Sequence, residues 1–406
     1  MMILRSDCLP MLADSARPVV ILATTPVGEA IHQALLDRGV NVAAFCDAKP
    51  GKAGSRFSGL EVVHTPEVGR RFPQARVVIA VADAADAVEQ LLESGIAEED
   101  IFSAASLLAD FSERCERHKY SRPLEYMRYA VSSYINAYMW AGDESALSLR
   151  SVDVVVTERC SLRCRDCSNL MAYYASPKDF DSESVLDAAA RLCASVDGIA
   201  EFRVIGGEPL MNRDWVHVVE GLLKLSQDRY VVIYTNGTIL PTEVQLDALK
   251  GERVVFNITD YGLLSRNLEP LCELLARYRI AYTVVSMDGW VDCGKVRPHN
   301  RTAEQLKRIY ADCCAKNLYS LLGGELYRCP FAANANNLRA IPQDEGNGVD
   351  LLDTISCSEL RRRIEAYVTR DSFLPACDFC NGRSYFAPSS FPPAIQASAA
   401  LPYQVY

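Results

Sequence analysis

Short apolar runs alternate with helix-like patterns through the first hundred residues of the chain. Three runs rich in β-branched side chains are typical of strands and cover 19–22, 40–45 and 76–81. Between them, apolar residues recur at helical spacing, first around Ile31 and Leu35 and again over 84–94. This alternation predicts a small doubly wound α/β domain, which we assign to residues 17–110.

A tyrosine-rich helical stretch at 111–149 connects this domain to a second alternating series. Strand-like runs of that series cover 152–156, 202–205, 231–235, 254–258 and 282–286, and helix-like patterns separate them at 184–194, 215–225, 243–249 and 268–278. Repeated units of this length predict parallel strands joined by right-handed crossovers. We therefore expect a barrel or an open parallel sheet over 150–295, with its chemistry at the carboxyl ends of the strands.

The alternation stops after residue 295. Two apolar runs flank Gly323-Gly324, a pair that favours a two-residue hairpin turn. We expect residues 296–385 to form a small cysteine-rich domain. Residues 386–406 contain four prolines, which is typical of an extended tail.

Length and charge narrow the class of protein. At 406 residues the chain is long enough for at least two domains. Its 42 basic and 52 acidic residues give a net charge of −10, which disfavours nucleic acid or an anionic membrane as the main partner. No apolar run approaches the roughly 18 residues that a membrane helix needs. The first twelve residues are too short and interrupted for a secretory signal, so we expect a cytoplasmic protein.

The fifteen cysteines are unevenly spaced, and three of them follow the first strand of the second series: Cys160, Cys164 and Cys167. A four-iron cluster has four iron corners, so three protein ligands leave one iron open to another molecule. A structural zinc site would need a fourth ligand nearby, and no His or Cys follows before Cys193. The alternatives are a zinc knuckle or buried thiols without metal.

Two further motifs end the next two strands. Gly206-Gly207-Glu208-Pro209 offers close backbone approach and a carboxylate that can hold an ammonium group. Thr235-Asn236-Gly237 offers polar groups for a ribose. Taken alone, the first motif could also be a turn before a helix, with Glu208 in a favourable first-turn position.

Together, the three cysteines and the Gly-Gly-Glu-Pro motif resemble the radical S-adenosylmethionine (radical SAM) superfamily over roughly residues 150–295. The resemblance implies a partial (β/α)6 barrel and a [4Fe-4S] cluster bound by Cys160, Cys164 and Cys167. It implies that S-adenosylmethionine chelates the open iron and is cleaved to a 5′-deoxyadenosyl radical, which abstracts a substrate hydrogen. The residues implied to contact S-adenosylmethionine are Gly206, Gly207, Glu208, Asn236 and Thr259.

One position departs from the family pattern. The residue before the third cysteine is often aromatic and packs on adenine, whereas this chain has Asp166. Adenine would then contact backbone, or the ring of Tyr173 or Tyr174.

The cysteine-rich region is similar to the SPASM and Twitch extensions of the same superfamily. Cys314 and Cys329 flank the predicted hairpin, and Cys377-Asp-Phe-Cys380 supplies a close pair. The resemblance implies a second iron–sulfur cluster bound by Cys314 (or Cys313), Cys329, Cys377 and Cys380. A zinc ribbon made of the same thiolates is the alternative. Cys357 lies in a helical pattern and is expected in the core.

Cys293 lies just past the last strand of the barrel, where a thiol could face the substrate. If the enzyme is an epimerase, Cys293 could donate a hydrogen atom to the substrate radical. A loop thiol without such a role is the alternative.

The first domain resembles the Rossmann-like nucleotide-sugar-associated domains of some sugar acyltransferases. Where Gly-x-Gly-x-x-Gly would stand, the chain keeps only Gly28, which makes NAD binding doubtful. Docking is one expected role, and holding a nucleotide-linked sugar near residues 24–28 and Asp47 is the other.

These features favour a radical SAM oxidoreductase or epimerase acting on a small polar or carbohydrate substrate, a class that includes nucleotide-linked sugars, with dehydrogenation or epimerisation as the outcome. Such an enzyme needs a reductase, or a donor of the flavodoxin or ferredoxin type. A peptide-modifying SPASM or Twitch maturase and a non-catalytic metal-binding scaffold are the alternative functions.

Overall fold

The computed structural model describes residues 9–12, 17–82, 85–139, 145–226, 229–287, 289–293, 295–344, 346–370, 372–384 and 390–406. It divides into two compact units, Met1–Ala146 and Leu147–Tyr406. Within the described ranges, no helix combines the length and the apolar character needed to cross a bilayer.

The first unit is a six-stranded sheet in the order β3-β4-β2-β1-β5-β6. Its strands are β1 (Val19–Leu22), β2 (Val42–Asp47), β3 (Arg56–Phe57), β4 (Leu60–His64), β5 (Arg76–Ile79) and β6 (Ile101–Ser103). Its helices are α1 (Leu9–Leu12), α2 (Pro26–Leu36), α3 (Val68–Arg71), α4 (Ala85–Glu93), α5 (Phe111–Arg114) and α6 (Leu124–Tyr138). All strand pairs are parallel except β3 with β4, so the predicted doubly wound sheet is confirmed.

The tyrosine-rich stretch supplies α6, which packs on this first sheet. The Tyr134 hydroxyl accepts a hydrogen bond from the Ala104 N–H (2.8 Å) and donates one to the Ile79 carbonyl (2.7 Å). Tyr138 likewise donates to the carbonyl of Val81 at 2.7 Å. These rings give α6 both apolar contact and satisfied polar ends, so the predicted connector is built into the first unit.

The second unit is built on an eight-stranded sheet in the order β13-β12-β11-β10-β8-β15-β16-β17. Its strands are β8 (Val152–Val155), β10 (Phe202–Ile205), β11 (Val231–Thr235), β12 (Val254–Asp260), β13 (Ala281–Ser286), β15 (Tyr319–Leu322), β16 (Glu325–Tyr327) and β17 (Val349–Asp350). Two smaller pairs join β7 (Ser148–Leu149) to β9 (Gly198–Ile199), and β14 (Trp290–Val291) to β18 (Ser390–Phe391). The helices are α7 (Ser182–Ser195), α8 (Trp215–Leu225), α9 (Glu243–Leu249), α10 (Leu268–Arg277), α11 (Ala303–Ala311), α12 (Pro330–Asn337) and α13 (Cys357–Val368).

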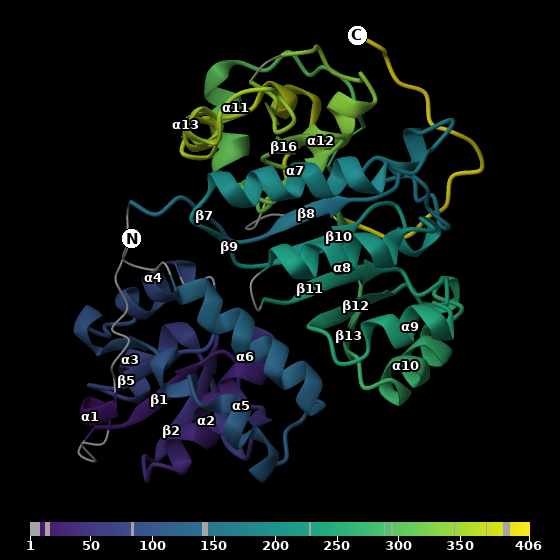
Figure 1. Ribbon diagram of the computed structural model, residues 1–406. Coiled ribbons are helices and arrows are strands. Elements are labelled where there is room, and N and C mark those ends of the chain that lie inside the picture. The colour runs from purple at the N-terminus through teal and green to yellow at the C-terminus, as the bar shows by residue number, and fades with distance from the viewer. Residues whose placement is uncertain are drawn as a thin grey trace. The chain divides into compact units, whose positions relative to one another are not determined.

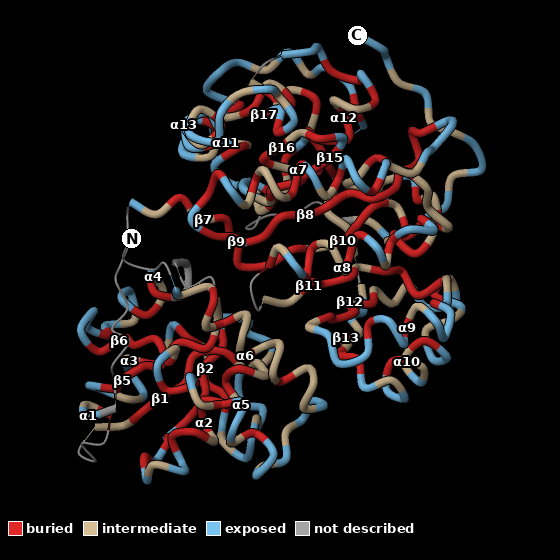
Figure 2. Tube along the Cα trace, viewed as in Figure 1, coloured by how far each residue is buried: buried red, intermediate tan, exposed pale blue. Residues whose placement is uncertain are grey.

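Strands β8, β10, β11, β12 and β13 are parallel neighbours in the predicted sequence order. Helices α7 and α8 lie side by side along them (Figure 1) and bury an apolar core that includes Leu192, Trp215 and Leu222. Figure 2 shows the strands of this sheet as largely buried. The sequence-based parallel α/β architecture is therefore confirmed, as an open sheet in which β13 and β17 form the edges.

The predicted hairpin forms, but it does not belong to a separate sheet. Gly323 and Gly324 adopt positive φ angles of 61° and 90°, as a primed turn requires. Strand β15 pairs in parallel with β8, so the hairpin extends the large sheet instead of standing apart. This pairing covers the β8 edge that β10 leaves free, where buried N–H and C=O groups would otherwise lack partners.

The tail over 390–406 lies along the second unit, and residues 386–389 of the predicted tail are outside the described ranges. The backbone N–H of Ala397 donates a hydrogen bond to the Arg163 carbonyl, and that of Leu401 donates one to the Ala172 carbonyl, both at 2.9 Å. In Figure 1 this yellow segment runs beside the sheet toward the C-terminus.

Candidate functional site

The three predicted cluster cysteines lie in one loop that follows β8. Cys164 is buried, and Cys160 and Cys167 are half-buried. Burial, together with the charges of neighbouring cysteines, raises the pKa of Cys164 to about 12 and that of Cys167 to about 11. The thiols are therefore close to one another in apolar surroundings, where a bound cation would stabilise their thiolate forms.

The two glycines after β10 allow the end of this strand to approach the cysteine loop closely. A Cβ atom on Gly206 would lie 2.6 Å from the Thr157 carbonyl oxygen, and one on Gly207 would lie 2.3 Å from that of Arg159. The Gly207 Cβ would also lie 2.5 Å from Cys160 Cβ. The two glycines thus seat the cysteine loop on the end of β10, in addition to lining the cavity described below.

Glu208 is fully buried and its carboxylate is occupied by protein donors. Oε1 accepts from the Thr235 hydroxyl (2.8 Å) and the Leu210 N–H (3.3 Å), and Oε2 accepts from the Asn236 N–H (2.8 Å). Burial raises its pKa to about 7 in spite of these bonds. Glu208 therefore ties the ends of β10 and β11 together, and it is absent from the residues that line the cavity. Its assignment to an ammonium group remains a prediction.

Asn236 joins the end of β11 to the cysteine loop. Its Nδ2 donates to Ser161 Oγ at 3.1 Å, and its Oδ1 accepts from the Thr238 hydroxyl at 2.6 Å. The Ser161 and Thr238 hydroxyls also bond at 2.5 Å. The amide is thus held rigidly at the cavity wall.

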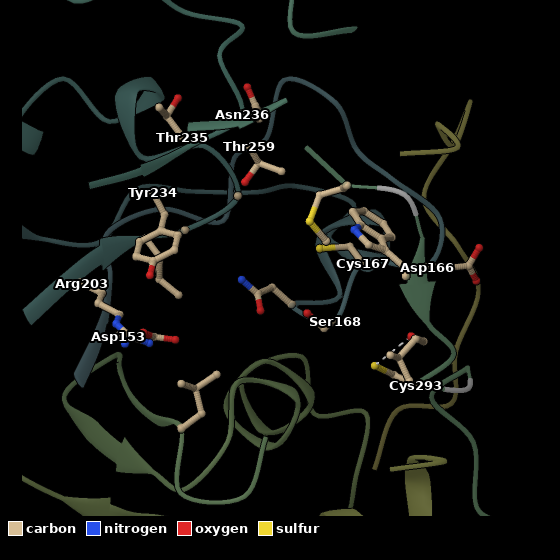
Figure 3. Close-up of a pocket in the computed structure, with 18 of the residues that line it drawn as sticks. Asp153, Asp166, Cys167, Ser168, Arg203, Tyr234, Thr235, Asn236, Thr259 and Cys293 are labelled. Carbon is tan, nitrogen blue, oxygen red and sulfur yellow. Dashed lines mark hydrogen bonds between the residues drawn. The ribbon is translucent and has the colours of Figure 1, made fainter. Parts of the chain in front are cut away.

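A cavity of about 300 Å³ opens at the carboxyl ends of β10, β11 and β12 (Figure 3). It brings together Cys167, the two glycines, Asn236, Thr259 and Cys293, all of which the sequence singles out. Cys293 is only 5% exposed. Its thiol donates a weak hydrogen bond to the Val291 carbonyl at 3.6 Å.

The aromatic side chains at the cavity are not those that the sequence suggests. Tyr261 and Trp290 line it, in an edge-to-face pair with centroids 5.8 Å apart. Tyr173 instead packs on Tyr403, and the Tyr174 hydroxyl donates to Asn334 at 2.9 Å. Neither Tyr173 nor Tyr174 lines this cavity, since both side chains pack in the core, and their contact with adenine stays a prediction. Tyr261 follows Asp260 at a strand end, which is the signal that could have identified it.

Sequence reasoning also missed the polar residues at the other end of the cavity. Asp153 of β8, Arg203 of β10 and Tyr234 of β11 line it there. Each lies within a run that the sequence pattern predicts as an apolar strand, and a charged residue such as Asp153 or Arg203 inside a buried strand is the signal that could identify this end of the cavity.

A second set of cysteines lines a smaller, apolar cavity of about 40 Å³. Its cysteines are Cys293, Cys313, Cys329, Cys377 and Cys380. Cys313 lies close enough to influence the pKa of both Cys329 and Cys377, whereas Cys314 is not among the lining residues. The thiols of Cys293 and Cys380 lie close enough for each to shift the pKa of the other, lowering that of Cys293 and raising that of Cys380.

The structure brings Cys313, the alternative first ligand, together with Cys329, Cys377 and Cys380 around this cavity, and the ligand set stays a prediction. Cys314 is not among the lining residues, and its N–H donates to the Arg383 carbonyl at 2.8 Å. Cys357 was expected in the core but is exposed at the start of α13. Among the described residues, no group of three His, Cys, Asp or Glu side chains is arranged to hold a single metal ion.

In the first unit, Asp47 at the end of β2 is engaged by hydrogen bonds from neighbouring side chains. Asp47 Oδ2 accepts from the Thr24 hydroxyl (2.6 Å) and from Lys52 Nζ (2.7 Å). Burial opposes ionisation, but these bonds hold the pKa of Asp47 at about 2. A Cβ at Gly28 would lie 2.5 Å from the Ala23 carbonyl oxygen, so this glycine serves helix–strand packing.

Three cysteines in a loop at the carboxyl end of a parallel sheet, beside a cavity, define a cofactor-dependent α/β protein. Residues 154–262 match the model of the radical SAM superfamily. This family carries a [4Fe-4S] cluster and S-adenosylmethionine, and a loop of three soft thiolates suits such a cluster.

Curated relatives match part of the chain. GTP 3′,8-cyclase of Clostridium acetobutylicum is 29% identical over 140 residues, which are 31% of this chain and 43% of the relative. The molybdenum cofactor biosynthesis protein moc-5 of Caenorhabditis elegans is 35% identical over 116 residues, 28% of this chain and 17% of the relative. The chain thus spans less than half of the length of these relatives.

Two solved structures show weaker similarity. BtrN in complex with AdoMet and 2-DOIA is 16% identical with a TM-score of 0.37, covering 58% of this chain and 93% of BtrN. SuiB of Streptococcus suis is 12% identical with a TM-score of 0.28, covering 50% of this chain and 47% of SuiB. Scores this low support no conclusion about the fold.

Proposed function

We propose that the protein cleaves S-adenosylmethionine reductively and removes a hydrogen atom from a small polar or carbohydrate substrate, giving dehydrogenation or epimerisation. The observation that carries this proposal is the single cavity that Cys167, Asn236 and Cys293 share with Asp153 and Arg203. One end offers the family's cofactor residues, and the other offers charged groups for a polar substrate.

The chain's own residues would prepare the site in three ways. Cys160, Cys164 and Cys167 would hold the cluster, and Glu208 and Asn236 would fix the strand ends around it. Tyr261 and Trp290 would exclude water from the cavity. When bound, the cluster and S-adenosylmethionine supply the electron and the 5′-deoxyadenosyl radical.

We also propose a second iron–sulfur cluster of the Twitch kind, with Cys313 in place of Cys314 as its first ligand beside Cys329, Cys377 and Cys380. The support is the apolar cavity that these four thiols line. Such a cluster would exchange an electron with the substrate radical or with an external donor, a reductase or a flavodoxin- or ferredoxin-type protein. Because the thiolates of both clusters need a reducing compartment, we also propose a cytoplasmic location.

Cys293 would donate the hydrogen atom if the outcome is epimerisation. Its thiol is buried, lines the cavity and lies beside Cys380. The Cys293→Ala variant should then lose net turnover while it still forms 5′-deoxyadenosine. Undiminished turnover in this variant would remove the role.

The test of the proposed function starts from anaerobically reconstituted protein with dithionite and S-adenosylmethionine. 5′-Deoxyadenosine should form, and the Cys164→Ala variant should form none, with the exposed Cys357→Ala as the matched control. If no 5′-deoxyadenosine forms in the cluster-loaded protein, the non-catalytic scaffold becomes the better function.

Labelled substrates separate the two enzymatic alternatives. Deuterium should reach 5′-deoxyadenosine from a deuterated sugar or nucleotide sugar. Transfer from a deuterated peptide instead would establish a maturase.

A further inference from the structure

The end of the cavity away from the cysteine loop contains a buried carboxyl group, and one of its oxygens has no hydrogen-bond donor among the described residues. Asp153 is 6% exposed and lines the cavity, and its Oδ1 has no hydrogen-bond partner among the described residues. In Figure 3, Asp153 and Arg203 lie together on one side of the cavity, and Cys167 lies on the other. The carboxyl group therefore sits within the substrate space but away from the cluster loop.

The register of the sheet places a second polar group beside it. Asp153 of β8 is paired with Arg203 on β10 and with Ser320 on β15, so the three side chains share one face. Ser320 is fully buried, and its Oγ also lacks a partner within the described part of the chain. Two unsatisfied polar side chains thus occupy paired positions on neighbouring strands, and of the two Asp153 is the one that lines the cavity.

The nearest cation is already engaged elsewhere. Arg203 Nε donates to Glu201 Oε1 at 2.6 Å, and the guanidinium lies over the Tyr234 ring, 5.8 Å from its centroid. Arg203 attracts the Asp153 charge, but no hydrogen bond between the two is present. The guanidinium is held in place, and Asp153 is left to accept from another donor.

Burying such a group without a partner is unfavourable. An unpaired polar atom in the interior is destabilising, and buried polar groups in native proteins are normally hydrogen-bonded. Burial raises the pKa of Asp153 to about 7, which reflects this cost. An apolar residue would fill the strand position at lower cost, so a ligand that restores the missing bond explains the carboxylate.

We propose that Asp153 binds a hydrogen-bond-donating substituent of the substrate, a hydroxyl or an amino group, and that Ser320 supports this carboxyl group from the paired position on β15. The two carboxyl oxygens exchange by rotation about χ2, so either can accept from the ligand. An anionic substituent is disfavoured here because it would face the Asp153 carboxylate. This inference rests on the proposed function and narrows its substrate class to compact polyols or amino sugars with an uncharged or cationic end.

The test measures binding of three matched probes to the reconstituted protein with S-adenosylmethionine bound, by calorimetry. The probes are D-glucose, D-glucosamine and D-glucuronate. They share a pyranose ring, and each of the last two differs from glucose at one carbon: glucosamine carries an amine at C2, and glucuronate carries a carboxylate at C6. Glucose or glucosamine should bind at least tenfold more tightly than glucuronate, and the comparison of the first two distinguishes hydroxyl from amine recognition.

Two variants connect the result to the subsite. Asp153→Leu should weaken binding of the favoured probe by tenfold or more, and Ser320→Ala should weaken it by less. The affinity for S-adenosylmethionine, measured in the same samples, should stay unchanged and serves as the control for folding.

The inference is overturned if glucuronate binds as tightly as the other probes, if none of the three binds, or if Asp153→Leu leaves probe binding unchanged. Formation of 5′-deoxyadenosine is scored separately. Cleavage without selective probe binding would refute the subsite alone, and absence of cleavage would refute the proposed function.

Discussion

The backbone N–H of Ala397 donates a 2.9 Å hydrogen bond to the carbonyl of Arg163, inside the loop that carries the three cysteines. Two more bonds join the same segments. Arg165 donates to the Ile395 carbonyl at 2.8 Å, and Gln396 Nε2 donates to the Leu162 carbonyl at 3.0 Å. With the buried side chain of Ala394 packed against Leu162 and Cys164, the C-terminal tail closes one side of the cysteine loop.

Removing residues 390–406 should therefore shorten the lifetime of the first cluster. The deletion exposes the loop to solvent and removes its bonds to the tail, each worth about 1 kcal/mol. We expect several-fold faster loss of the iron–sulfur absorbance in air. Removal of residues 404–406 alone keeps all of these bonds and should lose absorbance at the wild-type rate. Equal rates for both deletions would contradict the role of the tail.

Gly207→Ala should disrupt the site, because the new Cβ would lie 2.3 Å from the Arg159 carbonyl oxygen and 2.5 Å from Cys160 Cβ. We expect a loss of about 1–3 kcal/mol in the free energy of unfolding and reduced iron incorporation. Gly51→Ala is the matched control, since nothing lies within 4 Å of its added Cβ. Thermal unfolding and iron analysis give both values, and a neutral Gly207→Ala would show that the loop can move aside.

Cys313→Ala and Cys314→Ala should differ although the two residues are adjacent. Only Cys313 lines the second cysteine cavity. With two [4Fe-4S] clusters the protein would hold about eight irons per chain, and the iron content of the Cys313→Ala variant should fall toward about four. Cys314→Ala should keep the full complement. The reverse pattern would restore Cys314 as the ligand.

Asp153→Asn should make the protein without its cofactors more stable at neutral and alkaline pH. The pKa of Asp153 is raised to about 7 in the folded state. Ionisation of Asp153 therefore does not lower the free energy of unfolding of the wild type below about pH 4, and it lowers this free energy progressively as the pH rises toward 7. The variant has no carboxyl group to ionise at this position. The difference in free energy of unfolding between variant and wild type should thus be near zero at pH 4 and reach a few kcal/mol above pH 7.

Urea unfolding at pH 4.5, 6 and 8 measures this difference. A stability difference that does not change with pH would show that the carboxyl group has an ordinary pKa. The same substitution weakens the proposed substrate subsite, so stability and ligand binding should move in opposite directions.

Much of the architecture could be predicted because it depends on local pattern. The five parallel strands from β8 to β13 follow from β-branched runs separated by amphipathic helices. The positions of the cysteine loop and of Gly206-Gly207 follow as well, since parallel strands end at the same edge. The position of β15 could not be predicted, because its pairing with β8 spans more than 160 residues and has no local signal.

The sequence by itself determined the class of chemistry: three cysteines with fixed spacing after one strand and two glycines after the next specify the cluster loop and its seat. Tertiary structure alone decided which side chains meet around that loop. It brings Cys313 and not Cys314 to the wall of the second cysteine cavity, Tyr261 and not Tyr173 to the wall of the first, and Ser320 to the position paired with Asp153. The pairing of Asp153 with Ser320 depends on strand register, because a shift of one residue would turn either side chain to the opposite face. The other two outcomes depend on the direction that the chain outside the strands gives to each side chain.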